Sequence, residues 1–225
     1  MIDFEIPAEL AARRDEIRAF VAEQIVPFER DPRLTRHGPN EEMRNEMVEL
    51  ARKAGLLTVQ APKRFGGWEP THREQAVLFE AAGWSTLGPV AMNCAAPDEG
   101  NMFILSKIAN EAQAEEFLVP VIDGRQRSVF AMTEPDGAGS DPDQLKTEAV
   151  FDGTDYVING RKWLITGADG ARTWIIMARV APNPHGGDGP TLVLCDGGTP
   201  GIQLERGMDT MDRNYVQGHG VVRFD

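Results

Sequence analysis

The sequence FAMTEPDGAGSD at residues 130–141 decides the fold, because it stands where one kind of patterning ends and another begins. Before it, apolar residues recur at the three- and four-residue spacing of amphipathic helices. After it, they alternate with the two-residue period of strands. Its first residues are strand-like, and Pro135, Gly137 and Gly139 then predict a tight turn. We therefore expect an α+β fold, with helices first and strands second, and not an alternating α/β fold.

Five helices are expected on the N-terminal side of this stretch. Asn40 is a good N-cap, with two glutamates in the first turn that follows it, and Thr71 and Glu74 have the spacing of a capping box. The predicted helices span residues 7–24, 40–55, 71–83, 98–109 and 110–122. Together they predict an all-α helical domain over residues 1–124.

Short alternating segments follow, and two of them are joined by Asp152 and Gly153, a hairpin signal. The predicted strands span residues 128–133, 145–151, 156–162, 173–180, 191–196 and 216–224. Strands of this length with short connections favour antiparallel pairing. We therefore expect a small antiparallel β-barrel-like domain over residues 125–225.

Composition narrows the class of protein. With 225 residues, 41% of them hydrophobic, the chain can bury a core, and a formal charge of −12 repels a polyphosphate backbone, which argues against nucleic acid as a partner. Its sequence has no apolar run near the roughly 20 residues that a membrane-spanning helix needs, and its start lacks the pattern of a signal peptide. We expect a cytoplasmic protein. Cys94, Cys195 and the four histidines are scattered, so we predict no metal site.

Two segments could bind a ligand. In the first, alternate backbone amides of residues 130–133 and the Thr133 hydroxyl can face the polar rim of a flat ring, and Gly139 and Ser140 allow close approach of a phosphate or a substrate oxygen. In the second, GRKWLITG at residues 160–167, Trp163 and its neighbours offer an aromatic and aliphatic surface. Taken alone, the first segment is as well explained as a polar turn without a ligand. Trp163 alone is as well explained as a residue of the core. Dinucleotide-binding and Walker signatures are absent.

The order of these motifs resembles the acyl-CoA dehydrogenase family over the whole chain. FAMTEP, AGSD, INGRKWLITG and TPGI follow one another as they do in that family, and AGLL, FGG and NCAAPDEGNM occur in the helical part. The last string and TEPDGAGSD are most similar to the branch that in some organisms is fused to a kinase-like domain.

This resemblance implies FAD as cofactor and a fatty acyl-CoA as substrate, which is oxidised to the trans-2-enoyl-CoA. It also implies transfer of the electrons to an electron-transfer flavoprotein and a homo-oligomer, dimer or tetramer, at full length. Ser140 would also contact the CoA part of the substrate. The implied flavin-binding residues are Phe130, Ala131, Met132, Thr133, Gly139, Ser140, Trp163, Leu164, Ile165 and Thr166.

The catalytic base is not assigned. In the family a carboxylate of the C-terminal helical domain removes the α-proton of the substrate, and this sequence has no such domain. Glu99 and Glu134 are candidate bases, but neither has the support of a motif. The chain ends at Asp225 directly after a predicted strand, so we expect a fragment that is inactive by itself.

Two departures from the family pattern affect the site. Asp136 is an extra residue between TEP and GAGSD, which widens the turn. The place of the aromatic residue that stacks on the flavin in many relatives is taken by Leu164, with Trp163 one position earlier. Either residue could therefore contact the ring.

Three other functions fit the same residues. A flavin oxidase or monooxygenase on this scaffold would differ in the access of oxygen to the reduced flavin. A non-catalytic flavin- or acyl-CoA-binding subunit of a mixed oligomer would keep the fold without a base. A cofactor-free α+β protein would use both segments only as structure.

Overall fold

A computed structural model describes residues 5–136, 139, 141–186 and 188–225. The helical elements are α1 (Ala8–Phe20), η1 (Val21–Ile25), η2 (Val26–Arg30), α2 (Glu41–Lys53), η3 (Lys63–Phe65), α3 (His72–Ala82), α4 (Gly88–Ala91), α5 (Asp98–Ile108), α6 (Glu111–Gln113), η4 (Ala114–Leu118), α7 (Val119–Ile122) and η5 (Pro142–Gln144). The strands are β1 (Leu34–Thr35), β2 (Gly38–Pro39), β3 (Ser128–Ala131), β4 (Glu148–Phe151), β5 (Tyr156–Thr166), β6 (Thr173–Val180), β7 (Gly189–Asp196), β8 (Ile202–Met208) and β9 (His219–Phe224).

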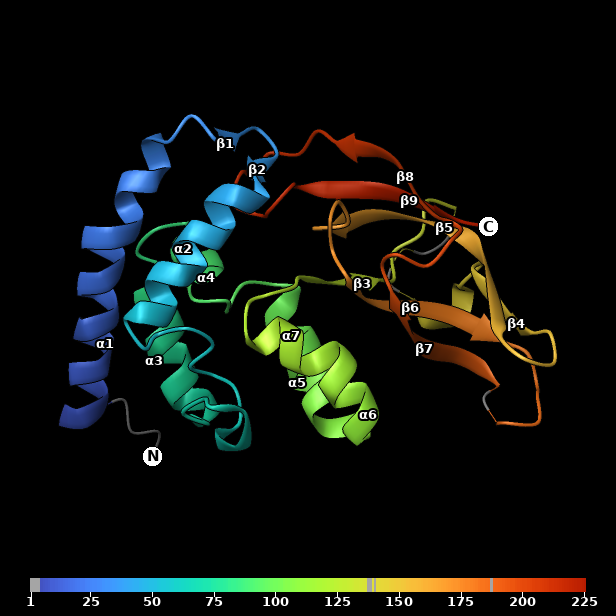
Figure 1. The fold of residues 1–225 in the computed structure, drawn as a ribbon, viewed down its shortest axis with the longest axis horizontal. Coiled ribbons are helices and arrows are strands. Elements are labelled where there is room, and N and C mark those ends of the chain that lie inside the picture. Colours follow the sequence, from blue (N-terminus) through green and yellow to red (C-terminus); the bar gives the residue numbers. More distant parts are fainter. Residues whose placement is uncertain (1–4, 137–138, 140, 187) are drawn as a thin grey trace.

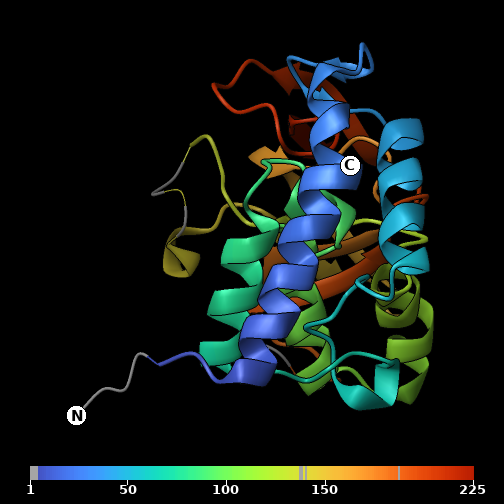
Figure 2. The same cartoon turned by 90° about the vertical axis from the view of Figure 1, so that its left-hand side faces the viewer.

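Helices gather at one end of the molecule and strands at the other (Figure 1). Turned by 90°, the same view shows α1 in front of the sheet (Figure 2). The helical end has its own apolar core, which includes Ile17 of α1, Met43 and Met47 of α2 and Leu78 of α3, each at most 1% exposed. A helical part followed by a β part is the order that the sequence predicts.

The two predicted helix starts are confirmed in their atomic detail. The Asn40 side chain accepts a hydrogen bond from the amide of Met43, and Thr71 and Glu74 form a reciprocal capping box. Both satisfy amides that the first turn of a helix leaves without an intrahelical partner. These local contacts fix where α2 and α3 begin.

The expectation of an antiparallel barrel is wrong. The seven main strands form one mixed sheet in the order β3-β6-β4-β5-β9-β8, with β7 also paired to β6. β3 and β4 both run parallel to β6, whereas β4–β5, β6–β7, β5–β9 and β8–β9 are antiparallel. β3 and β4 are each separated from β6 in the chain by at least one other strand, so the rule for short hairpins does not apply to the two parallel pairs.

The hairpin predicted at Asp152 and Gly153 is present. The Asp152 carboxylate accepts from the amides of Thr154 and Asp155 at 2.9 Å, and Gly153 has a φ of 113°. The hairpin fixes the register of β4 against the first half of β5. Beyond it, β5 runs on to pair with β9, so the predicted strand at residues 156–162 is longer than expected and includes Trp163 to Thr166.

Two arginines hold the segment that leads from the helical end into the sheet. Arg44 of α2 donates to the carbonyl oxygen of Gly124 at 2.6 Å. Arg127 donates to the Glu41 carboxylate and to the carbonyl oxygens of Gly167 and Asp169, just after β5. Because the Arg127 side chain is almost fully buried, its contacts hold the end of β5 in a fixed place beside α2.

Candidate functional site

The two segments that the sequence singles out lie side by side. The backbone amide of Trp163 donates to the carbonyl oxygen of Thr133 at 3.0 Å, and the Lys162 ammonium donates to the carbonyl oxygen of Met132 at 2.9 Å. β3 and β5 are not neighbours in the sheet order, so these bonds bridge the two segments outside the regular ladder. The structure thus brings together Thr133 and Trp163, which are distant in sequence.

An irregularity in β5 turns one side chain outward. The register of β5 against β9 shifts between Lys162 and Ile165, and Leu164 has a φ of 55° and is 44% exposed. A left-handed backbone is strained for a leucine and is often found at functional sites. The bulge leaves an apolar side chain at the surface where a flat ring could pack.

Trp163 carries an unsatisfied donor. Its indole Nε1 is buried and has no hydrogen-bond partner among the described residues, although its side chain as a whole is half-buried. A buried donor of this kind costs roughly 1–3 kcal/mol unless a ligand or water accepts from it. This donor and the exposed Leu164 fit a ligand that is flat and has polar edges, as a flavin is.

An ion pair lies directly beneath the first segment. The Lys162 ammonium lies 2.8 Å from the Glu134 carboxylate, which also accepts from the amides of Lys146 and Thr147. Burial raises the pKa of Glu134, but the hydrogen bonds from Lys162 and the two amides outweigh it and hold that pKa below its usual range. Glu134 is therefore an ionised, fully occupied structural group and is unsuited to act as a base.

Glu99 is no better placed as a base. It lines a groove of about 400 Å³ on the helical part, together with His72, Met102 and Phe103. Neither Thr166 nor Trp163 borders this groove. Burial raises the pKa of Glu99, partly opposed by His72. Neither Glu134 nor Glu99 is thus placed to act as a base at the two signature segments.

The hydroxyl of Thr166 ends a chain of polar groups. It lies 2.9 Å from Nδ1 of His219, whose Nε2 lies 3.0 Å from both oxygens of Asp212. Thr166 and His219 face each other because β5 and β9 are paired at this register. Sequence reasoning treated His219 as one of four scattered histidines, and no local signal could have linked it to Thr166.

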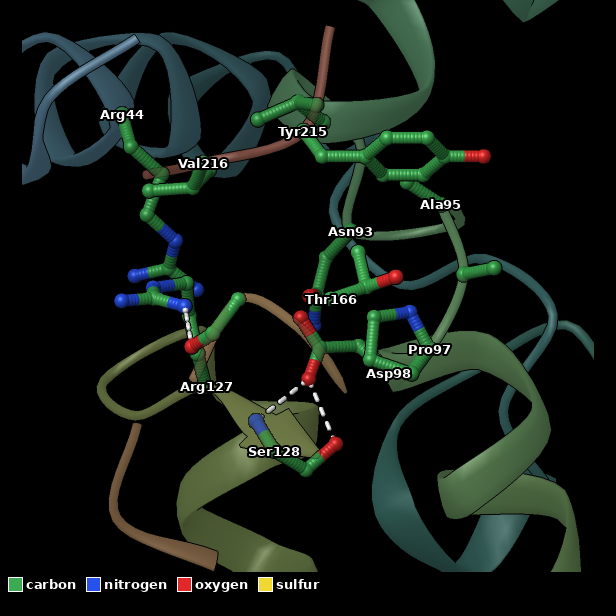
Figure 3. A pocket seen from close by; sticks show the side chains of 13 residues that line it. Arg44, Asn93, Ala95, Pro97, Asp98, Arg127, Ser128, Thr166, Tyr215 and Val216 are labelled. Atoms are coloured by element: carbon green, nitrogen blue, oxygen red, sulfur yellow. Dashed lines mark hydrogen bonds between the residues drawn. The ribbon is translucent and has the colours of Figure 1, made fainter. Parts of the chain in front are cut away.

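Thr166 also borders a cavity between the helical end and the sheet. Asp98, at the start of α5, points into it and accepts from the amide and hydroxyl of Ser128 at 2.6 Å (Figure 3). Burial raises the pKa of Asp98, against opposing hydrogen bonds from Ser128. The cavity is about 30 Å³, enough for a water molecule, and its other walls include Tyr215 and Arg127.

Several of the other residues predicted to bind flavin have side chains that pack in the core. Ala131 and Ile165 are buried at 0% and 1%, and Phe130 packs against the cluster that contains Ile175. Their side chains serve the core, so only their backbone could meet a ligand. Gly139 has a φ of 66°, which suits glycine. Ser140 lies outside the described residues.

Neither a metal centre nor a membrane span stands out in the described part of the chain. No cluster of three or more His, Cys, Asp or Glu side chains there could hold a metal ion, and none of its helices is both long and apolar enough to cross a bilayer. Burial raises the pKa of the Cys94 thiol to about 12. Cys94 therefore packs as an unreactive thiol.

Along its length the chain matches two domains of one family. Residues 7–125 match the acyl-CoA dehydrogenase N-terminal domain, and residues 129–225 match the acyl-CoA dehydrogenase middle domain. A curated relative, the probable acyl-CoA dehydrogenase FadE2 of Mycobacterium tuberculosis, is 35% identical over 97% of this chain and 55% of its own length. Acyl-CoA dehydrogenase family member 10 of Mus musculus is 32% identical over 93% of this chain and 21% of its own length.

Solved structures share the fold. A putative acyl-CoA dehydrogenase from Mycobacterium abscessus superposes with a TM-score of 0.86 at 36% identity, over 99% of this chain and 58% of that one. A glutaryl-CoA dehydrogenase from Mycobacterium smegmatis in complex with FADH2 has a TM-score of 0.77 at 23% identity, over 98% and 53%, a likeness of fold. The chain thus spans about half the length of FadE2 and of these two proteins. The two matched domains show that it belongs to the acyl-CoA dehydrogenase family.

Proposed function

We propose that this chain supplies the flavin-binding part of an FAD-dependent acyl-CoA dehydrogenase, which oxidises a fatty acyl-CoA thioester to its trans-2-enoyl-CoA. The observation that carries the proposal is the hydrogen bond from Trp163 to Thr133, since it joins the two family signatures into one surface. Family membership supplies the cofactor, because acyl-CoA dehydrogenases bind FAD. The exposed Leu164 supports it from this chain's own residues, as does the indole nitrogen of Trp163, which has no hydrogen-bond partner in the described part of the chain.

Each proposed contact has a distinct task. The backbone of residues 130–133 would face the polar rim of the flavin ring, and Leu164 or Trp163 would lie against its face. The Thr166 hydroxyl would meet the N5 and O4 side. Gly139 would allow close approach of the ligand, and Ser140 would contact the cofactor and the CoA part of the substrate. Bound FAD would supply the acceptor for the hydride that leaves the substrate's β-carbon.

Other parts of the proposal concern the whole protein. Glu134 is held in an ion pair and Glu99 faces another groove, so neither is proposed as the catalytic base, which by the family pattern would come from a C-terminal helical domain. An electron-transfer flavoprotein would accept the electrons, and the whole protein would be a cytoplasmic homo-oligomer. The similarity to acyl-CoA dehydrogenase family member 10, a much longer protein, supports the proposal that the chain is related to the branch with fused domains.

Binding of FAD to the chain tests the proposal. Under conditions in which the Thr166 hydroxyl donates to the flavin, we expect Thr166→Val to weaken binding about tenfold, because loss of one hydrogen bond costs about 1–1.5 kcal/mol. Thr191→Val is the matched control, since Thr191 lies on β7 and its hydroxyl bonds only to the carbonyl oxygen of Gly189 in the described structure. Flavin fluorescence titrations measure both. Equal affinity of the two variants would contradict the assigned contact, and no saturable binding by the parent chain would contradict the cofactor.

A further inference from the structure

His219 is held in one orientation by groups on both sides of its ring. Nε2 lies 3.0 Å from each oxygen of Asp212, and Nδ1 lies 2.9 Å from the Thr166 hydroxyl. The Tyr215 ring packs against the imidazole at a centroid distance of 5.3 Å. The His219 side chain is 10% exposed, so it has little freedom to turn toward solvent.

Asp212 determines which nitrogen of the ring carries a proton. Burial raises the pKa of Asp212, but hydrogen bonds from His219 and Thr210 outweigh it and hold that pKa below its usual range. An ionised carboxylate only accepts hydrogen bonds, so Nε2 must be the protonated nitrogen. In the neutral ring Nδ1 then carries a lone pair and faces Thr166.

The state of the ring therefore decides what Thr166 can offer to a ligand. Beside a neutral His219, the hydroxyl donates its proton to Nδ1 and presents only lone pairs. Beside a charged His219, Nδ1–H donates to the hydroxyl oxygen, and the hydroxyl proton is free to be donated elsewhere. One proton on His219 thus reverses the direction of the Thr166 hydrogen bond.

This reversal matters at a flavin because N5 changes its own character. N5 of oxidised flavin has a lone pair and accepts a hydrogen bond, whereas N5 of reduced flavin carries a hydrogen and donates one. A hydroxyl that donates to N5 favours the oxidised ring as a hydride acceptor, by withdrawing electron density from it. The partner of Thr166 would thus be the group that controls this contact.

We propose that His219, oriented by Asp212, is a positioning residue that sets whether the Thr166 hydroxyl donates to or accepts from N5 of the flavin. The inference rests on the proposed function, because it takes the flavin to meet Thr166. It adds a role for His219 and Asp212, neither of which lies in a family signature used above.

Other charged groups near the ring belong to separate contacts. Arg36 pairs with Asp209 at 3.1 Å, and His37 of the turn between β1 and β2 lies 3.9 Å from the same carboxylate. Across the cavity that Thr166 borders, Arg127 is held by Glu41, and Asp98 is held by Ser128. Arg44, on the same wall, donates to the carbonyl oxygen of Gly124. In the described structure, Asp212 is the one carboxylate hydrogen-bonded to the imidazole.

The test follows the ¹⁵N resonance of N5 in the chain loaded with FAD labelled at that atom, as pH is varied in the oxidised state. We expect N5 to become more shielded in one step as pH falls, because a charged His219 frees the Thr166 proton for N5. His219→Gln should bind FAD within a few-fold of the parent and show no such step. His185→Gln, a loop histidine exposed to solvent, should titrate as the parent does.

Two further variants separate the relay from a structural role. Thr166→Val should abolish the N5 step while the ¹⁵N signals of the His219 ring still titrate. Asp212→Asn should alter the N5 step, because it removes the carboxylate that holds the His219 ring in its orientation.

Three results would overturn the inference. A pH-independent N5 resonance in the FAD-loaded parent chain, or a step that survives in His219→Gln, would overturn this inference and leave the proposed function standing. Failure of the parent chain to bind FAD would overturn both.

Discussion

Lys162 and Glu134 form a buried ion pair across the two signature segments, with Nζ 2.8 Å from Oε1 and side chains 0% and 4% exposed. Lys162 precedes the β5 bulge, and Glu134 follows Thr133, so the pair fixes the two walls of the proposed site against each other. A buried pair of this kind adds little net stability compared with apolar residues, but removal of one partner is costly. Its role here is to hold two backbone segments in one place.

Removal of the lysine should therefore destabilise the chain strongly. Lys162→Met leaves the Glu134 carboxylate buried without its cation, and we expect a loss of about 3–5 kcal/mol in the free energy of unfolding. Lys146→Met is the control, because Lys146 is exposed and should change stability by less than about 0.5 kcal/mol. Urea unfolding measures both. A similar small loss in the two variants would contradict the structural role.

The same pair predicts a dependence on pH. Because the folded pKa of Glu134 lies below its ordinary value, its stabilising contribution is complete above the ordinary glutamate pKa and is lost as pH falls through the folded one. Glu134→Gln should thus be less stable than the parent at neutral pH, and the gap should narrow in acid. Unfolding curves at several pH values test this. The exposed Glu148→Gln serves as control, and a gap that stays constant in Glu134→Gln would count against the argument.

Arg127 is expected to hold the helical end to the sheet. Arg127→Met would leave the Gly167 and Asp169 carbonyl oxygens without their donor and release Glu41, for a loss of about 2–4 kcal/mol. Arg125→Met, two residues away with a side chain 59% exposed, should have little effect. Thermal unfolding compares them, and equal melting temperatures of the two variants would refute the clamp.

Glycine should be tolerated at position 164 and not at a comparable regular position. Leu164 has a φ of 55°, so Leu164→Gly relieves about 1 kcal/mol or more of backbone strain. This gain offsets the extra conformational entropy that glycine loses on folding. Val157→Gly in the first half of β5, where valine is 43% exposed and pairs with Val150 in an unbroken register, lacks that gain and should lose about 1 kcal/mol. If Leu164→Gly proved the less stable of the two by urea unfolding, the strained bulge would be in doubt.

The features that could be predicted from the sequence are those that depend on contacts between near neighbours in the chain. The start of α2 at Asn40, the capping box at Thr71 and the hairpin at Asp152 each depend on contacts between residues two or three positions apart, and each is confirmed. β8 was missed because most of its side chains are exposed, so it lacks an alternating apolar face. Its place in the sheet comes from pairing with β9.

Contacts between distant strands could not be predicted in this way. The parallel pairing of β3 and β4 with β6 depends on a crossover, and the residues themselves carry no mark of its direction. Likewise, Lys162 meets Glu134, and His219 meets Thr166, only once the register of β5 is fixed. The flavin signatures were visible as strings, whereas the polar groups that support them were not.

One measurement tests the central claim most directly: the shifts of backbone amide resonances when FAD is added to the ¹⁵N-labelled chain. The account predicts saturable shifts concentrated at Met132, Thr133, Trp163, Leu164 and Thr166, the residues of the two joined segments. The absence of saturable shifts would contradict it, as would shifts confined to the groove around Glu99 and His72 on the helical part.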